Sequence, residues 1–155
     1  MIKLLDILEN NILVPRRSKE ERAKNHQITL QKQVQQYIKG GSKGKLDLYR
    51  SPITSLPSNL TVGGDLDLAH SNITSLPSGL SVGGDLDLSG TPITSLPPGL
   101  SVGGDLELYG TSITSLPSDL KVRDGLYLGN TPLSKSHKVE QIRQMAPGVK
   151  GNIFI

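Results

Sequence analysis

Seven carboxylates recur at a spacing of twenty residues along the middle of the chain, where they form two series. The first series consists of Asp47, Asp67, Asp87 and Glu107. The second series consists of Asp65, Asp85 and Asp105. Carboxylates in pairs can perform acid–base chemistry or cleave glycosides, stacked carboxylates can bind a hard cation, and a carboxylate surface can bind a basic partner.

Catalysis by these carboxylates is disfavoured by the repetition itself. Acid–base pairs need two unlike environments that separate their pKa values, whereas a repeated ladder offers one environment several times. The chain has no cysteine, and His26, His70 and His137 show no metal-ligand spacing or evident nucleophile partner. We therefore expect no enzymatic activity and no cofactor.

Metal binding has little more support. A calcium solenoid carries a Gly-Gly-x-Gly-x-Asp type of turn, which this sequence lacks. We expect weak, nonspecific cation binding at most, and no metal site. A Gly-rich phosphate loop is also absent, because Gly63 and Gly64 precede a predicted strand and do not lead into a helix.

The carboxylates sit in a twenty-residue block that is copied along the chain. The copies at 64–83 and 84–103 differ only at the positions held by Ala69, His70, Ser71, Asn72 and Ser78. Repetition at this period predicts a solenoid, in which each copy forms one coil and buries its apolar face against its neighbours.

Each coil contains a short predicted strand. Leu66 and Leu68 alternate with an acidic residue, which is the pattern of a strand with one buried face. Consecutive strands must be parallel and about 4.8 Å apart. Pro77 and the Gly63-Gly64 pair disfavour a helix on the outer side, so we expect extended chain there. The six predicted strands begin at Leu46, Leu66, Leu86, Leu106, Leu126 and Ile153.

The repeat resembles the twenty-residue leucine-rich repeats of bacterial secreted effectors. Their Leu-x-Leu-x-x-Asn-x-Leu core is matched by residues 86–93, with Thr91 in place of Asn, and the resemblance extends over residues 44–133. A hydroxyl at this position is expected to bond to the neighbouring coil's backbone. Glycine at 63, 83 and 103 departs from the leucine of that family. Similar arrays occur among small phage-encoded proteins, and another right-handed β-solenoid is the alternative fold.

Helices are predicted on both sides of the repeats. Ser18 and Glu21 form a capping box for a helix that ends at Gly40-Gly41, and Ser136 is the predicted N-cap of a second helix that stops at Pro147-Gly148. We therefore predict an α/β leucine-rich-repeat solenoid with a parallel sheet on its concave face and helical caps at both ends. Its parts are an N-terminal cap at 1–43, repeats at 44–133 and a C-terminal cap at 134–155, within one structural domain.

Charge is unevenly distributed over these parts. Residues 1–43 carry nine basic and four acidic groups, residues 44–128 carry four basic and nine acidic groups, and residues 129–155 carry four basic and one acidic group. The basic stretch at 15–24 is interpreted as a solvated linker, so we expect no nucleic acid and no membrane as partner. Neither an export signal nor a run of about 20 apolar residues is present, and we expect a cytoplasmic protein.

Aromatic residues gather on the predicted concave face. Four of the chain's five aromatic residues, Tyr49, Tyr109, Tyr127 and Phe154, fall at outward positions in or beside the strands. Tyrosine supplies anchoring area at interfaces. The predicted partner-binding residues are Tyr49, Asp65, Asp67, Asp85, Asp87, Asp105, Glu107, Tyr109, Tyr127 and Phe154.

These features predict a non-enzymatic module that binds a protein partner with a basic surface, as a monomer or a weak homo-oligomer. The alternative is a phage-type inhibitor that blocks a host defence or nucleic-acid-binding protein by acidic mimicry. Two simpler readings stay open: duplication copied a solvated carboxylate, and Tyr127 and Phe154 fill the space under the C-terminal cap.

Overall fold

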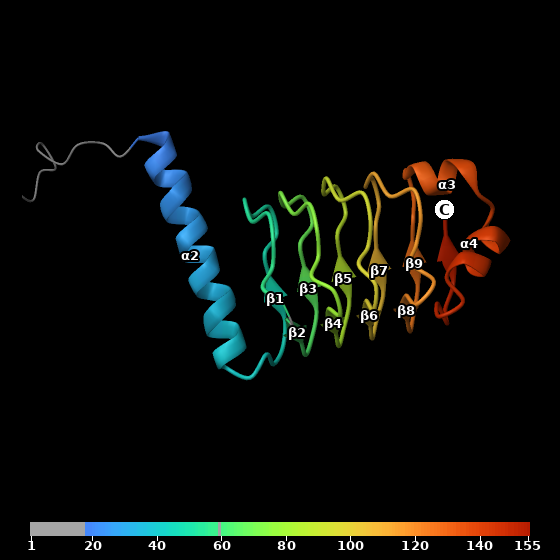
Figure 1. Ribbon diagram of the computed structural model, residues 1–155, viewed down its shortest axis with the longest axis horizontal. Helices are drawn as coiled ribbons and strands as arrows, with labels where there is room; N and C mark the ends of the chain where they lie inside the picture. The colour runs from blue at the N-terminus through green and yellow to red at the C-terminus, as the bar shows by residue number, and fades with distance from the viewer. Residues whose placement is uncertain (1–17, 59) are drawn as a thin grey trace, which may run out of the picture.

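The chain folds into a parallel β-solenoid with a period of about twenty residues, preceded by a long helix (Figure 1). The computed structural model describes residues 18–58 and 60–155. The helix, α2 (Lys19–Lys39), stands beside the first coil, and about four turns of solenoid follow it. None of the helices within the described ranges is long and apolar enough to cross a membrane.

One sheet contains all six predicted strands, paired in parallel and in the order of the sequence. Its members are β1 (Leu46–Asp47), β3 (Leu66–Asp67), β5 (Leu86–Asp87), β7 (Leu106–Glu107), β9 (Leu126–Tyr127) and β10 (Ile153–Phe154). Each strand begins at the residue predicted for it, the first five at intervals of twenty residues and β10 at Ile153. The register is strict, since Leu66 pairs with Leu86 and Asp67 with Asp87, so equivalent residues of successive coils form straight columns.

A second sheet, which the sequence reasoning missed, lies on another side of the coil. Its four parallel strands are β2 (Thr61–Val62), β4 (Ser81–Val82), β6 (Ser101–Val102) and β8 (Lys121–Val122). In each strand the valine is buried while the preceding residue is at least partly exposed. A pair of residues is too short to show the alternation that marks a strand, so the sequence pattern did not predict this sheet.

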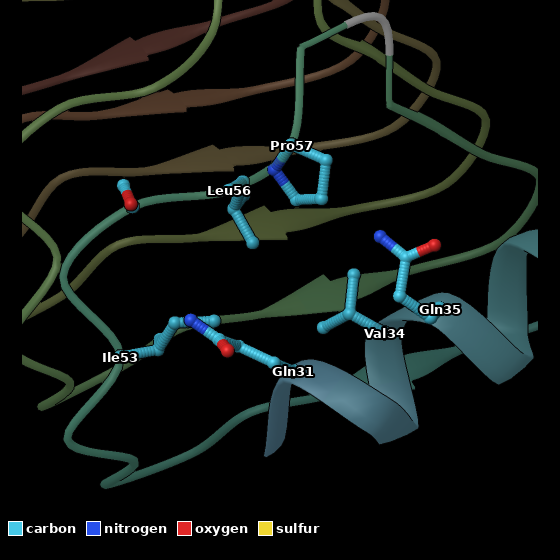
Figure 2. Close-up of a pocket in the computed structure, with 7 residues that line it drawn as sticks. Gln31, Val34, Gln35, Ile53, Leu56 and Pro57 are labelled. Atoms are coloured by element: carbon cyan, nitrogen blue, oxygen red, sulfur yellow. The ribbon is translucent and has the colours of Figure 1, made fainter. Parts of the chain in front are cut away.

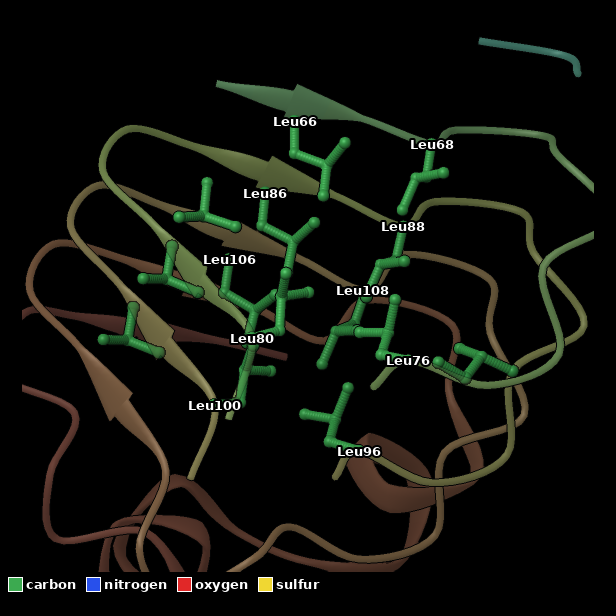
Figure 3. Close-up of a cluster of buried hydrophobic side chains, with 14 of the residues drawn as sticks. Leu66, Leu68, Leu76, Leu80, Leu86, Leu88, Leu96, Leu100, Leu106 and Leu108 are labelled. Carbon is green, nitrogen blue, oxygen red and sulfur yellow. The ribbon is translucent and has the colours of Figure 1, made fainter. Parts of the chain in front are cut away.

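The core is a stack of leucine, isoleucine and valine layers, one layer for each coil. Leu86 and Leu88 point inward from the six-stranded sheet and meet Leu80 and Leu100 from the opposite wall (Figure 3). All four are fully buried. Leucines at two alternate positions in and directly after each of the first five strands thus supply the apolar layer that a single coil cannot bury alone.

The glycine pairs allow the coils to approach each other closely. A Cβ on Gly83 would collide with the backbone carbonyl of Gly63, and a Cβ on Gly84 would collide with the carboxylate of Asp65. The same conflict recurs one coil later, at Gly103 and Gly104. Glycine is therefore required here because backbone stacks directly on backbone.

The buried hydroxyls behave differently from the prediction. Thr91 Oγ1 donates to the carbonyl of Leu88 at 2.7 Å, within its own coil and not to the neighbouring one, and Thr111 and Thr131 repeat this contact. The hydroxyl therefore closes the turn that ends its own strand.

Helix α2 begins at the predicted capping box and ends at Gly40. Ser18 Oγ accepts from the amide of Glu21 at 3.1 Å, and the amide of Ser18 donates to the Glu21 carboxylate at 2.8 Å. Leu30 and Val34 bury their side chains, and Val34 faces Ile53 and Leu56 of the first coil (Figure 2). A groove of about 330 Å³ remains between the helix and this coil.

The C-terminal helices correct one prediction. Ser136 is the last residue of α3 (Pro132–Ser136) and not the N-cap of the next helix, α4 (Val139–Met145), which begins after Lys138. Thr131 caps α3, and Ser136 Oγ donates back to the carbonyl of Pro132 at 2.9 Å. The hydroxyl is thus used at the end of one helix, so it is not available to start the other.

Candidate interaction face

The outward side of the six-stranded sheet, called here the acidic face, carries a central column of polar and aromatic residues. Its members are Asp47, Asp67, Asp87, Glu107, Tyr127 and Phe154. The first three carboxylates each accept a hydrogen bond from the amide two residues further on, at 2.8 to 3.2 Å. These bonds hold each carboxylate over the turn that follows its own strand.

The neighbouring inter-coil column consists of Asp65, Asp85 and Asp105, and its bonds run between coils. Asp65 Oδ1 accepts from the amide of Asp85 at 3.0 Å, and Asp85 Oδ1 accepts from the amide of Asp105 at 2.8 Å. Asp105 Oδ1 continues the series to the amide of Gly125. One oxygen of each carboxylate therefore joins successive coils, while the negative charge stays at the surface.

The two columns border a shallow hollow of about 160 Å³. Asp65, Asp67, Asp85, Asp87 and Glu107 supply its acidic lining. Lys45 supplies a positive charge at one end, where its Nζ lies 3.3 Å from Asp67 Oδ2 and 4.0 Å from Asp47 Oδ2. The hydrogen bond and the charge of Asp67 raise the pKa of Lys45. The negative charge of the hollow is therefore least neutralised at the end near Asp87 and Glu107.

Glu107 is the one member of the central column's four acids for which the described structure shows no hydrogen bond to backbone or side chain. It is partly buried, and this desolvation raises the pKa of Glu107, with further contributions from the negative charges of Asp87 and Asp105. A cation placed over the hollow would relieve the repulsion and lower that pKa.

Aromatic rings replace the acids at the C-terminal end of the central column. The rings of Tyr127 and Phe154 stack in parallel, with centroids 4.5 Å apart and planes 11° apart. Burial and the charges of Asp105 and Glu107 raise the pKa of Tyr127, so its hydroxyl stays protonated at neutral pH. The structure therefore brings these two predicted residues into one apolar platform beside the acids.

The other two predicted tyrosines lie apart, in different coils. Tyr49 and Tyr109 are 47 % and 59 % exposed, and about 14 Å separates their coils at the usual strand spacing. The ring of Tyr49 meets the ring of His70 edge-on, with the two ring centroids 5.9 Å apart. The Arg50 guanidinium lies 5.2 Å from the centroid of the Tyr49 ring. His70 and Arg50 were not predicted as site residues. Arg50 follows Tyr49 in the chain, and the coil register places His70 beside them.

Chemically, the face offers fixed negative charges, one balancing lysine and exposed aromatic rings. Within residues 18–58 and 60–155, no three Asp, Glu or His side chains are grouped so that they could hold a metal ion. The arrangement suits electrostatic recognition combined with aromatic contact.

Comparison of the chain with models of protein families, with curated proteins and with solved structures finds no match.

Proposed function

We propose that this chain is a non-enzymatic interaction module that binds a protein with a basic surface on its acidic face. In this proposal the repeat is of the leucine-rich class, α2 caps one end, and α3 and α4 cap the other. The fixed carboxylates steer and orient the partner, while Tyr49, Tyr109, Tyr127 and Phe154 supply most of the contact energy.

One observation supports this proposal above the others. The large apolar side chains exposed in the described residues are Ile28, Tyr49, Tyr109, Phe154 and Ile155. Three of these five are aromatic and lie in or beside the strands of the acidic face. Aromatic rings are exposed here beside carboxylates that hydrogen bonds to the backbone hold in place. This combination is more typical of a binding interface than of a surface that contacts only solvent.

An acidic face could also imitate a nucleic-acid backbone, so a phage-type inhibitor of a DNA- or RNA-binding protein is the second candidate. The column spacing supports it, because carboxylates repeat at strand intervals along one straight line. The two candidates differ in one respect: only the mimic competes with nucleic acid for its partner.

Affinity capture from source-cell lysate tests the proposal. The test bait carries Asp67→Asn, Asp87→Asn, Glu107→Gln and Tyr109→Ala, where each Asn keeps an oxygen that can accept the turn bond. The matched control removes three charges and one exposed apolar side chain elsewhere, through Glu20→Gln, Asp124→Asn, Glu140→Gln and Ile28→Ala.

We expect a partner that the unchanged chain and the control retain, that the test bait loses, and that high salt releases. Equal retention by all three baits, or retention that does not respond to salt, would overturn the proposal. Added DNA or RNA that displaces the partner would identify the mimic.

A further inference from the structure

The outward side of the four-stranded sheet has the opposite chemistry to the acidic face. One of its columns runs Thr61, Ser81, Ser101, Lys121. Backbone bonds align the next column, which runs Lys43, Gly63, Gly83, Gly103, Arg123, Lys150. Neither column contains an acidic residue, and the cations are concentrated in the last two coils.

These cations are departures from the repeat. Lys121 stands where Ser81 and Ser101 stand in the preceding copies, and Arg123 stands where the preceding copies have glycine. Lys150 comes from the irregular C-terminal segment, and its amide donates to Val122 O at 2.8 Å, which places it beside Arg123. Copying of the block therefore does not account for this cluster.

The three cations surround a hollow of about 350 Å³. Its lining also contains Ser101, Gly103 and Gly148, together with the edges of Val102 and Val122. The two glycines present backbone with no side chain, and both valines are otherwise buried. The site thus combines a partly apolar floor with a rim of positive charge.

No described residue neutralises this rim. Within residues 18–58 and 60–155 the ion pairs are those of Lys45, on the other sheet. Asp124 follows Arg123 in the chain and is exposed, but it makes no ion pair in this part of the structure. The amides of Lys121, Arg123 and Lys150 all donate to the preceding coil, so an anion would be held by the side chains.

We propose that this hollow binds a phosphate monoester, with the phosphate between Lys121, Arg123 and Lys150 and the ester group over the Gly103 and Val122 floor. The guanidinium fork matches phosphate geometry, and with the two ammonium groups it supplies three positive charges, more than enough to neutralise a dianion. The apolar part of the floor favours an ester with an apolar body over free phosphate.

A nucleic acid fits this surface less well. Its backbone needs cations along a track, whereas the column beyond the hollow carries glycine in three successive coils before Lys43. Four strand spacings, or about 19 Å, therefore separate Arg123 from Lys43. The charge is therefore concentrated enough for one phosphate group and absent where further phosphates would lie.

The test is an amide chemical-shift titration of the full chain with phenyl phosphate and, separately, with inorganic phosphate. Saturable shifts are expected at Ser101, Gly103, Lys121 and Gly148, with phenyl phosphate binding more tightly. The double variant Lys121→Ser, Arg123→Gly restores the residues of the preceding coils and therefore leaves the fold intact. It should weaken binding by about tenfold or more.

The control variant Lys32→Gln, Lys39→Gln removes the same charge from α2 and should stay within about twofold of the unchanged chain. Shifts that do not saturate, that lie outside the hollow, or that persist in the double variant would overturn the proposal. A single-stranded oligonucleotide that binds more tightly than phenyl phosphate, through the same cations, would also overturn it, in favour of nucleic acid. This site is independent of the acidic face, so either proposal can fail alone.

Discussion

The two sheets of this solenoid present different chemistry on their outward sides, although one twenty-residue repeat builds both. On the six-stranded sheet, acids recur in every copy from β1 to β7, and all of them except Glu107 accept hydrogen bonds from backbone amides. On the four-stranded sheet, the copies carry hydroxyls and glycines, and positive charge is concentrated where Lys121 and Arg123 depart from the repeat and Lys150 joins them.

This difference shows that a residue copied into every coil and a residue found in one coil carry different information about function. A residue copied into every coil can serve the stacking of coils, as Asp85 does when it accepts a hydrogen bond from the amide of Asp105. A residue that breaks the repeat, such as Lys121 or Arg123, marks a place where the surface of one coil differs from that of the others. The aromatic residues Tyr127 and Phe154 break the repeat on the acidic face in the same way.

The largest expected effect is at the glycine column beside the four-stranded sheet. Gly83→Ala would place a Cβ against the carbonyl of Gly63, so we expect the free energy of unfolding to fall by roughly 2–3 kcal/mol. Ser81→Ala, on the same outward side, should change it by less than about 0.5 kcal/mol. Urea unfolding of both variants measures this contrast, and equal stability of the two would show that the coils are not in backbone contact.

The second prediction compares the two acidic columns. Asp85→Ala removes a bond between coils and should lower the free energy of unfolding by about 1 kcal/mol. Asp87→Ala removes a bond within one coil and should cost about 0.5 kcal/mol. Each variant removes one negative charge, so the relief of repulsion is common to both. A greater loss for Asp87→Ala would contradict the assignment of the inter-coil column.

A smaller, pH-dependent effect is expected at Glu107. Its raised pKa means that the folded state holds this proton more tightly than the unfolded state does, so the stabilising contribution is complete at low pH. That contribution is lost as the pH rises from the usual glutamate pKa through the raised one. Glu107→Gln should therefore match the unchanged protein at acidic pH and exceed it at neutral pH. Urea unfolding midpoints of both proteins across this pH range measure the effect. A variant that is less stable than the unchanged protein at neutral pH would contradict the destabilisation of the Glu107 carboxylate by burial and neighbouring charge.

The sequence predicts the first five strands because the leucine period sets their positions, and it predicts β10 because residues 151–155 repeat the pattern of those strands. It does not show that Asp65 reaches the amide of Asp85, since that bond requires the coil spacing and the missing side chain of Gly84. The second sheet was missed because two residues per coil give no alternation. The end of α3 was misread because Ser136 suits an N-cap equally well until the earlier cap at Thr131 is known.

The cationic hollow was also missed, although the sequence holds the relevant signal. Lys121 and Arg123 stand out once the copy at 104–123 is aligned with the two before it. Lys150 cannot be found in this way, because it joins the cluster only through the return of the chain after α4.

The central claim, that the acidic face is the binding surface, is tested most directly by mapping amide shifts while the full chain is titrated with a lysine-rich peptide carrying one aromatic residue. We predict saturable shifts at Asp67, Asp87, Glu107 and Tyr127 that weaken as salt is added, with none at Lys121 or Arg123. Shifts concentrated on α2 or on the four-stranded sheet, or shifts that salt leaves unchanged, would contradict the claim.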